Sequence, residues 1–394
     1  MKACLSAVCK IFLLFGVMLI HLRGSSQSLI GVPRVAILAP LYIDSAFDNT
    51  TYKLGSTSMP RYILPGLEFY NGAMLAIDSI KKSGRSLDVW VFDTKKKNLT
   101  VDALAKEMES LQFSLVIAAF SNLTEQKRFA EFAFSNNVPL VSATYPNDAY
   151  VSGNPFFIML NSTLKTHIEG IYKQVQRMYP VGKFLLVTRK GNMEERILDM
   201  FADAGKKTYP IKYKTVELPD NFTEDQLLPL LDSNDQNIVI CGSLDENFST
   251  NLIKTLDRSA TFPVTLVGSP TWDGLRAVVR TGNANLSILY STPFNYIRTD
   301  KTIAGIAAKY RQKLNARPGD MALKGYESMF YFSNLLLQYN KDFLNNLSDP
   351  KYRIANAYNL QPVKLQTSAQ IPDYIENKKL YFITRSLGKI TAVN

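Results

Sequence analysis

Hydrophobic positions along this chain follow two alternating spacings, one typical of helices and one typical of buried strands. Between residues 66 and 82, apolar side chains recur with a period near 3.6, at Leu67, Tyr70, Met74, Ile77 and Ile80. Apolar runs at 34–42 and 87–94 flank this segment, and each has the length of a strand rather than of a helix. The order strand, helix, strand predicts two parallel strands joined by a right-handed crossover.

The same alternation continues in two arrays of similar size. The first array adds helices at 101–111 and 124–136 and strands at 114–120, 139–141 and 156–160. The second comprises helices at 163–178, 193–204, 224–231 and 247–257 and strands at 183–188, 211–218, 237–241 and 264–268. The remaining elements are a strand at 286–294, helices at 303–314 and 321–339, and a weak strand pattern at 380–393 with a turn at Gly388. Two successive arrays predict an α/β fold of two doubly wound, Rossmann-like lobes.

Polar residues gather where the buried strands end. Ser142, Ala143, Thr144 and Tyr145 directly follow the strand at 139–141. Ligands of open α/β sheets bind at the carboxyl ends of the strands, so we interpret this stretch as the rim of a cleft. Other strand ends supply further candidates for ligand binding, namely Arg189, Ser243, Trp272 and Asp273.

These residue types also have structural roles at strand ends, and both interpretations stay open. Serine and threonine cap helices, a tyrosine before a proline wedges a turn, arginine is often solvated, and tryptophan packs between lobes as readily as against a ligand. The polar stretch 43–65 is predicted to be a long loop on the cleft side of the sheet. It either contributes to specificity or is disordered.

The N-terminal segment has the features of a cleaved signal peptide. Lys2 and Lys10 precede an apolar run at 11–20, and small residues follow at 24–26. This run is shorter than the stretch of about 18 residues that spans a bilayer, and no later run reaches that length. We therefore expect residues 1–26 to be removed, and the mature protein to be periplasmic or secreted without a membrane anchor.

The mature chain carries little of the chemistry that enzymes need. It keeps one cysteine, Cys241, in an apolar run typical of an inert buried thiol, and one histidine, His167, expected on a helix surface. It has no metal-binding histidine spacing, no Gly-x-Ser-x-Gly elbow and no phosphate-binding glycine loop. A pair of catalytic carboxylates stays open, because two such residues can meet in space without a motif. We predict that the protein is not an enzyme and binds no cofactor or metal.

The formal net charge of the chain is +11, and removal of the leader with its three basic residues leaves +8. A basic surface attracts nucleic acid, anionic polymers of the cell envelope or an anionic ligand. Here the lysines are scattered, with one tight run at 95–97, and an exported protein does not meet nucleic acid. Nucleic acid is therefore not an expected partner.

Five short motifs, in their order along the chain, resemble the type I periplasmic binding proteins, in particular the leucine-binding-protein branch of solute-binding proteins. They are RVAILAPL at 34–41, GLEFYNGAMLAID at 66–78, VPLVSAT at 138–144, LVGSPTW at 266–272 and KGYESMFYF at 324–332. The resemblance covers nearly all of the mature chain. It implies two lobes, joined by three crossings, that close on a ligand like a hinged shell.

The three crossings of this hinge are expected near residues 160, 286 and 339. They divide the mature chain between two lobes, each built from two separate stretches of sequence. The expected first lobe is 34–160 plus about 286–339, and the expected second lobe is 161–285 plus about 340–394.

Amino-acid-binding members of this family hold their ligand through a serine after the third strand and a Ser/Ala/Thr segment after the fourth. Ser121 and residues 142–144 match these places, so the resemblance implies that they bind the ligand. Hydroxyl groups beside free N–H groups at a helix start form a ready anion site. The chain departs from the family at 119–120, where Gly-Pro is usual, and at 189–192, where an aromatic–acid pair is usual. These departures keep an anionic or larger ligand open beside an amino-acid-like one.

Our hypothesis from the sequence is a solute-binding protein that captures a small ligand in the cleft between its lobes by hinge closure. Its expected partners are that small molecule and either a membrane permease or an envelope protein. The alternative is a non-catalytic envelope scaffold, or a regulator of cell-wall enzymes, that uses the same fold with a vestigial cleft.

Overall fold

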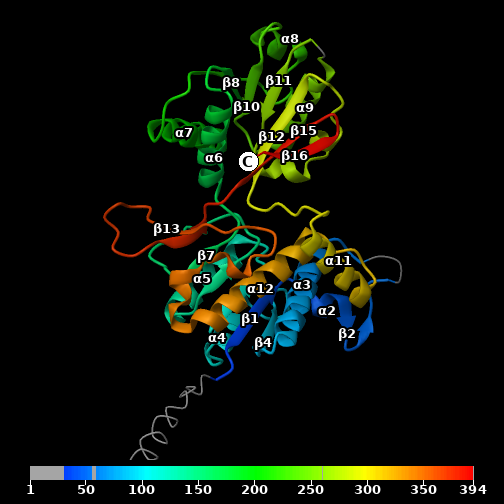
Figure 1. The fold of residues 1–394 in the computed structure, drawn as a ribbon, viewed down its shortest axis with the longest axis vertical. Coiled ribbons are helices and arrows are strands. Elements are labelled where there is room, and N and C mark those ends of the chain that lie inside the picture. Colours follow the sequence, from blue (N-terminus) through cyan, green and yellow to red (C-terminus); the bar gives the residue numbers. More distant parts are fainter. Residues whose placement is uncertain (1–30, 56–58, 260, 394) are drawn as a thin grey trace, which may run out of the picture.

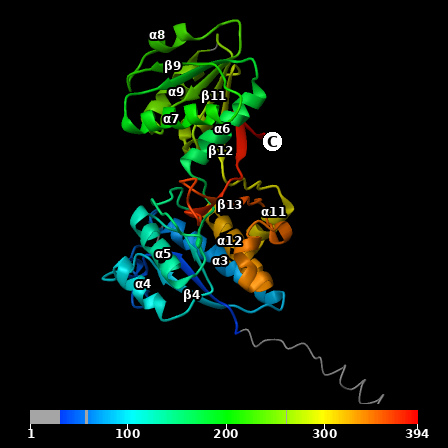
Figure 2. The same ribbon diagram turned by 90° about the vertical axis from the view of Figure 1, so that its left-hand side faces the viewer.

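The computed structural model describes residues 31–55, 59–259 and 261–393, which form two α/β lobes stacked end to end (Figures 1 and 2). Each lobe is built on a seven-stranded sheet that is mostly parallel. The strand order is β13-β14-β7-β6-β5-β1-β4 in the first lobe and β16-β15-β12-β11-β10-β8-β9 in the second. The expected α/β fold of two doubly wound lobes is confirmed. The expected signal peptide lies outside the described residues.

The first sheet has a centre of short strands that are buried on both faces. Its strands are β1 (Arg34–Ala39), β4 (Asp88–Asp93), β5 (Leu115–Ala118), β6 (Leu140–Ser142), β7 (Phe157–Met159), β13 (Leu360–Val363) and β14 (Tyr374–Asn377). Alternate residues of β1 enter two different cores: Val35 and Ile37 face one side, and Ala36 and Leu38 face the other. Burial on both faces explains why such strands appear in the sequence as continuous apolar runs.

Helices cover both faces of this sheet. One core lies under α3 (Leu64–Lys82), α11 (Lys301–Leu314) and α12 (Asp320–Tyr339), and the other lies under α4 (Val101–Glu109) and α5 (Leu123–Asn136). The late helices α11 and α12 therefore pack on the first lobe, as the sequence predicted.

The second lobe repeats this design. Its strands are β8 (Lys183–Thr188), β9 (Tyr213–Glu217), β10 (Asn237–Cys241), β11 (Val264–Val267), β12 (Leu286–Thr292), β15 (Tyr381–Ser386) and β16 (Lys389–Val393). Helices α6 (Leu164–Met178) and α7 (Asn192–Lys206) pack on one face, and α9 (Glu246–Arg258) packs on the other. The strands β15 and β16 run antiparallel at the edge, with β15 paired to β12.

Two of the expected lobe boundaries are wrong. Strand β12, assigned to the first lobe, pairs with β11 in the second sheet, so the second crossing begins only after Thr292. Residues 340–377, assigned to the second lobe, contribute β13 and β14 to the first sheet, and the third crossing follows at 378–380. Hydrophobic spacing identifies a strand, but the sheet that the strand joins depends on pairing with residues far away in the sequence.

The segment 43–65 is also more ordered than a long loop where it is described. It contains α2 (Ile43–Ala46) and a hairpin of β2 (Phe47–Asp48) and β3 (Thr51–Tyr52). Asp93 at the end of β4 holds the start of this segment by accepting hydrogen bonds from the N–H groups of Leu41 (2.9 Å) and Ile43 (2.8 Å).

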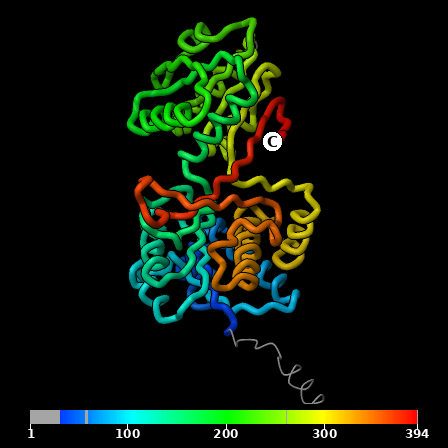
Figure 3. The backbone as a smooth tube through the Cα atoms, turned by 60° about the vertical axis from the view of Figure 1, so that its left-hand side comes forward, coloured from blue at the N-terminus to red at the C-terminus, as the bar shows by residue number. Residues whose placement is uncertain are grey.

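Three segments of chain cross between the lobes (Figure 3), and buried polar side chains tie them together. Glu376, at the end of β14 just before the third crossing, accepts hydrogen bonds from the N–H (2.7 Å) and the hydroxyl (2.8 Å) of Thr163 in the first crossing. Ser162 Oγ donates to the carbonyl of Asn377 at 2.7 Å. Glu327 of α12 accepts from the N–H of Asn356 at 2.7 Å and from Tyr296 Oη at 3.1 Å, which anchors the second crossing.

Two glycines allow α3 and α12 to approach each other closely. A Cβ atom at Gly72 would lie 1.9 Å from the carbonyl oxygen of Ala322, and one at Gly325 would lie 2.0 Å from the carbonyl oxygen of Phe69. Both obstacles are backbone atoms, which cannot rotate away as a side chain can. The contact between the two helices therefore requires glycine at both positions.

We predict that Gly72→Ala lowers the free energy of unfolding by about 1–3 kcal/mol, because the two helices must separate to admit the methyl group. Urea denaturation followed by circular dichroism measures this change. Gly305 of α11 is the matched control, because nothing lies within 4 Å of its added Cβ. Gly305→Ala should raise stability by roughly 0.5–1 kcal/mol through helix propensity. Equal stability of the two variants would contradict the close contact.

Candidate functional site: a cleft between the lobes

A cleft of about 850 Å³ lies between the two lobes. Its first wall comes from α12, from the loop after β6 and from the second crossing at 293–298. Its second wall comes from the start of α6, the turn after β11, and strands β12, β15 and β16. The volume is typical of a site for a small molecule.

Lys324 of α12 brings a cation to the first wall of the cleft. Its Nζ atom lies 4.2 Å from the centroid of the Phe294 ring, and the side chain is half-buried. Burial lowers the pKa of the Lys324 ammonium, while the charges of Asp320, Asp273 and Glu327 act in the opposite direction. Among the described residues, none of the ion pairs includes Lys324. A partly buried cation without a carboxylate partner is a frequent mark of a binding site.

Arg385 of β15 brings a second cation to the cleft, from the other lobe. Its Nε atom donates to Tyr290 Oη at 3.3 Å, and that hydroxyl donates to Asp273 Oδ1 at 2.9 Å. Burial raises the pKa of the Tyr290 hydroxyl to about 12, so it stays protonated at neutral pH. Within the part of the chain that the structure describes, Arg385 also forms no ion pair. At the rim of the cleft, Arg298 is already paired with Asp320.

His167 borders the cleft but is buried, so the prediction of a surface position is wrong. The side chain is 1% exposed, and its Nδ1 atom lies 2.8 Å from Ser291 Oγ of β12. Burial lowers the pKa of the imidazole from 6.5 to about 3. At neutral pH, His167 is therefore a neutral hydrogen-bonding group.

Two of the residues predicted to bind a ligand, Tyr145 and Asp273, line this cleft. The hydroxyl groups predicted beside Tyr145 do not reach it. Ser142 is fully buried and donates to Gln126 Oε1 at 3.0 Å, and Ala143 is buried next to it. Thr144 Oγ1 donates to the carbonyl of Phe120 at 3.1 Å.

Ser121 lies at the start of α5, where its hydroxyl donates to Glu125 Oε2 at 3.2 Å. The side-chain cap of this helix is Asn122, which accepts from the N–H of Glu125 at 2.9 Å. Neither Ser121 nor Asn122 is among the residues that line the inter-lobe cleft.

The predicted residues of the second lobe, apart from Asp273, are held by other groups. Arg189 forms a two-pronged ion pair with Asp220, with a distance of 3.0 Å between Nη2 and Oδ2. Ser243 is buried and donates to Glu194 Oε1 at 2.6 Å. Trp272 is 1% exposed and packs over Gly268 in the core of the lobe, where a Cβ would lie 2.0 Å from the indole ring. Trp272 thus packs within one lobe.

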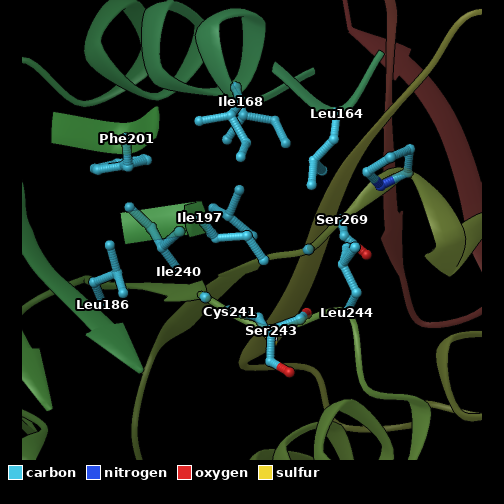
Figure 4. A pocket seen from close by; sticks show the side chains of 15 residues that line it. Leu164, Ile168, Leu186, Ile197, Phe201, Ile240, Cys241, Ser243, Leu244 and Ser269 are labelled. Carbon is cyan, nitrogen blue, oxygen red and sulfur yellow. Dashed lines mark hydrogen bonds between the residues drawn. The ribbon is translucent and has the colours of Figure 1, made fainter. Parts of the chain in front are cut away.

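A small apolar cavity of about 30 Å³ opens beside the cleft, between α6 and the ends of β10 and β11 (Figure 4). Figure 4 shows the side chains of Ile168 and Ile197 facing this space. Leu164 and Leu244 border both the cavity and the cleft. Cys241 also borders the cavity, and burial raises the pKa of its thiol to about 11, as an inert buried cysteine requires.

Sequence reasoning did not single out Lys324, Arg385 or Tyr290 as site residues. Lys324 had one usable signal: it is the one Lys or Arg of α12, a helix in which most positions are apolar. Such a position predicts either a buried cation or a charge that reaches the surface. Arg385 and Tyr290 come together only because β15 pairs with β12 in the antiparallel direction.

In the described part of the chain, no group of three or more His, Cys, Asp or Glu side chains is arranged to hold a metal ion. No helix in that part combines the length and the apolar character needed to cross a membrane.

Comparison with known proteins places this chain by its fold. No protein-family model matches it, and no curated protein sequence matches it closely. The fold is similar to that of a putative branched-chain amino acid ABC transporter protein from Rhodospirillum rubrum, at 14% identity and a TM-score of 0.64, covering 92% of this chain and 100% of that one.

Two further solved structures contain amino acids. A substrate-binding protein from Desulfitobacterium hafniense, in complex with Leu, is 13% identical with a TM-score of 0.57, over 92% of this chain and 100% of that one. The protein LivJ from Streptococcus pneumoniae, in complex with isoleucine, is 14% identical with a TM-score of 0.51, over 92% of this chain and 99% of that one. The chain therefore has the type I periplasmic binding protein fold, the fold of leucine and branched-chain amino acid substrate-binding proteins.

We predict that His167 makes the protein less stable as the pH falls from 6.5 to 5. In this range the unfolded chain takes up a proton on the imidazole, whereas the folded protein, with a pKa of about 3, does not. Stability should therefore fall by at most about 1.4 kcal/mol per pH unit from this group.

Urea denaturation at several pH values, compared between the native protein and His167→Gln, isolates this effect because the contributions of the carboxyl groups cancel. The native protein should show the steeper loss of stability on acidification. Equal slopes for both proteins would mean that the imidazole is protonated in the folded state.

Proposed function

We propose that this protein is a non-enzymatic solute-binding protein that captures a small amino-acid-like or anionic ligand in the cleft between its lobes. The observation that carries this proposal is Lys324, a partly buried cation at the cleft wall that has no carboxylate partner in the described part of the chain. Removing a charge from water is costly unless an opposite charge or hydrogen bonds replace the water. The carboxylate of a ligand would supply that opposite charge.

Contacts from both lobes would let such a ligand close the cleft. Lys324 belongs to the first lobe and Arg385 to the second, and both line the same space. A ligand shifts an open–closed equilibrium only if it binds the closed state more tightly. One anionic group held between the two cations gains its second charge-assisted contact only when the lobes approach, so it favours closure.

The other features of the cleft fit an amino acid or a related acid. Asp273 lies at the same wall as Arg385 and offers a carboxylate to an ammonium group. Phe294, Tyr145 and the apolar cavity behind Leu164 accommodate a carbon side chain. The solved structures that share this fold include proteins in complex with Leu and isoleucine, which supports the amino-acid-like class. Export to the periplasm or the outside, and delivery to a membrane permease, follow from this proposal.

One observation favours the second candidate, a scaffold or regulator with a vestigial cleft. The hydroxyl groups of Ser142 and Thr144, at the places where amino-acid-binding members contact their ligand, are occupied by hydrogen bonds inside the first lobe. An envelope protein would be the partner in that case.

The first experiment is native mass spectrometry of the protein purified from the cell envelope of the organism that produces it. The mass of the native protein is compared with the mass after denaturation. Release of a small acid, or thermal stabilisation by one member of a panel of amino acids and small carboxylic acids, supports solute binding. A protein that carries no small molecule and responds to no member of the panel contradicts it and favours the scaffold.

We predict that Lys324→Met weakens binding of the acid found in this way by roughly 10-fold to 100-fold, because one charge-assisted contact is lost. Isothermal titration calorimetry measures the change. Lys309→Met, at an exposed position of α11 in the same lobe, is the matched control and should bind as the native protein does. Unchanged affinity in Lys324→Met would contradict the proposal that Lys324 binds the acid group of the ligand. The variant should still fold, because methionine fills a similar volume without a charge to bury.

A further inference from the structure

A second pocket, of about 360 Å³, lies within the first lobe, between the segment that follows β1 and the start of α3. Its walls come from α2, the β2–β3 hairpin, the first half of α3 and Val91 of β4. Figure 1 shows α2 and β2 next to α3 in this lobe. Among the described residues, none borders both this pocket and the inter-lobe cleft, so the two spaces are separate.

The lining of this pocket is apolar and carries no charged side chain. Eight of its ten residues have aliphatic, thioether or phenyl side chains, and the other two are Tyr52 and Tyr70. Ile43, Phe47 and Val91 are exposed although they are large and apolar, with exposed fractions of 48%, 40% and 39%. Apolar side chains that gather at an open pocket are typical of a binding surface. A charged molecule would find no partner in this lining, so the pocket favours a neutral one.

Tyr52 contributes a hydrogen-bond donor that the protein itself does not use. Its Oη atom is buried and has no hydrogen-bond partner in the part of the chain that the structure describes. The ring packs edge-on against Phe47, with 5.5 Å between the two centroids. A buried hydroxyl group without a partner costs free energy, because its hydrogen bonds to water are lost. An acceptor atom on a molecule in the pocket would restore one of these bonds.

Hydrogen bonds hold the walls of the pocket in place without a ligand. The N–H of Lys53 donates to the carbonyl of Ala46 at 3.0 Å, which joins the end of the hairpin to α2. Asp44 Oδ2 accepts from the N–H of Lys97 at 3.1 Å, which joins α2 to the segment after β4. An apolar space with fixed walls takes up apolar molecules more readily than water, because water needs polar partners there. The volume also falls within the range of small-molecule sites.

From this arrangement we infer that the pocket binds a small, neutral, apolar molecule with a hydrogen-bond acceptor, such as an aromatic ketone or ester. Its carbon skeleton packs against the aliphatic and aromatic lining, and Tyr52 Oη donates to its acceptor atom. All walls of the pocket belong to the first lobe, so occupancy does not require closure of the inter-lobe cleft. The inference therefore does not rest on the proposed function.

The probes are 2-acetylnaphthalene and 2-isopropenylnaphthalene, which have the same shape but differ in one group. The second compound carries a CH2 group in place of the carbonyl oxygen. Equilibrium dialysis against the whole protein measures the affinity for each probe. We expect saturable binding of both, and Tyr52→Phe should weaken binding of the ketone by roughly 3-fold to 10-fold while changing that of the hydrocarbon less than 2-fold. Tyr62→Phe, at an exposed tyrosine of the same segment outside the lining, is the matched control and should bind both probes as the native protein does.

A second variant tests the place of the site. Val91→Trp puts a large side chain into the pocket from an exposed strand position and should weaken binding of both probes by at least 10-fold. Thr215→Trp, on the exposed edge strand β9 of the other lobe, is its control and should change neither affinity. If Val91→Trp does not fold, Tyr52→Phe still decides the outcome, because it adds no group to the protein.

Three results overturn the inference. They are absence of saturable binding of the ketone, equal effects of Tyr52→Phe on the ketone and the hydrocarbon, and equal affinities in Val91→Trp and Thr215→Trp. The second result would mean that the hydroxyl group of Tyr52 does not contact the acceptor atom, and the third that the probes bind elsewhere.

Discussion

The path of the second crossing over the first lobe depends on the buried carboxylate of Glu327. It is 1% exposed and accepts hydrogen bonds from the N–H groups of Ala355 (3.0 Å) and Asn356 (2.7 Å), from the side chain of Asn356 (2.7 Å) and from Tyr296 (3.1 Å). Burial raises the pKa of this carboxyl group, and the hydrogen bonds oppose that change. A buried carboxylate is tolerated only when its lone pairs are used in this way. The second crossing is consequently fixed to the first lobe.

Glu376 connects the other two crossings through hydrogen bonds and an ion pair. It is 1% exposed, binds Thr163 at the start of α6 through two hydrogen bonds, and is paired with Lys378. Asn377 next to it donates to the carbonyl of Leu160 at 3.2 Å. Apolar packing holds each lobe together, whereas directional polar contacts hold the hinge. Such contacts specify a geometry and still leave the hydrophobic cores of one lobe separate from those of the other.

Helix α12 shows how one element serves both the hinge and the cleft. Lys324 and Glu327 are three residues apart, so they project from neighbouring positions of the helix. The carboxylate accepts hydrogen bonds from the second crossing and from Asn356, and the ammonium lines the cleft beside the Phe294 ring. The helix itself is fixed by its glycine contacts with α3. The cation of the cleft is therefore presented from a rigid support, as a preorganised binding group should be.

The sequence by itself determined the elements, because their periodicity is local. It predicted the two arrays, the helices α11 and α12 on the first lobe, and the inert environment of Cys241. It did not determine the lobe of β12 or the pairing of residues 360–377, since both depend on partners distant in the chain. Strand-end position singled out Tyr145 and Asp273, which line the cleft. It could not show that the short hydroxyl side chains of Ser142 and Thr144 bond within their own lobe, or that Lys324 and Arg385 line one space. A strand end specifies an edge of a sheet, but only the tertiary structure decides which side chains at that edge already have partners.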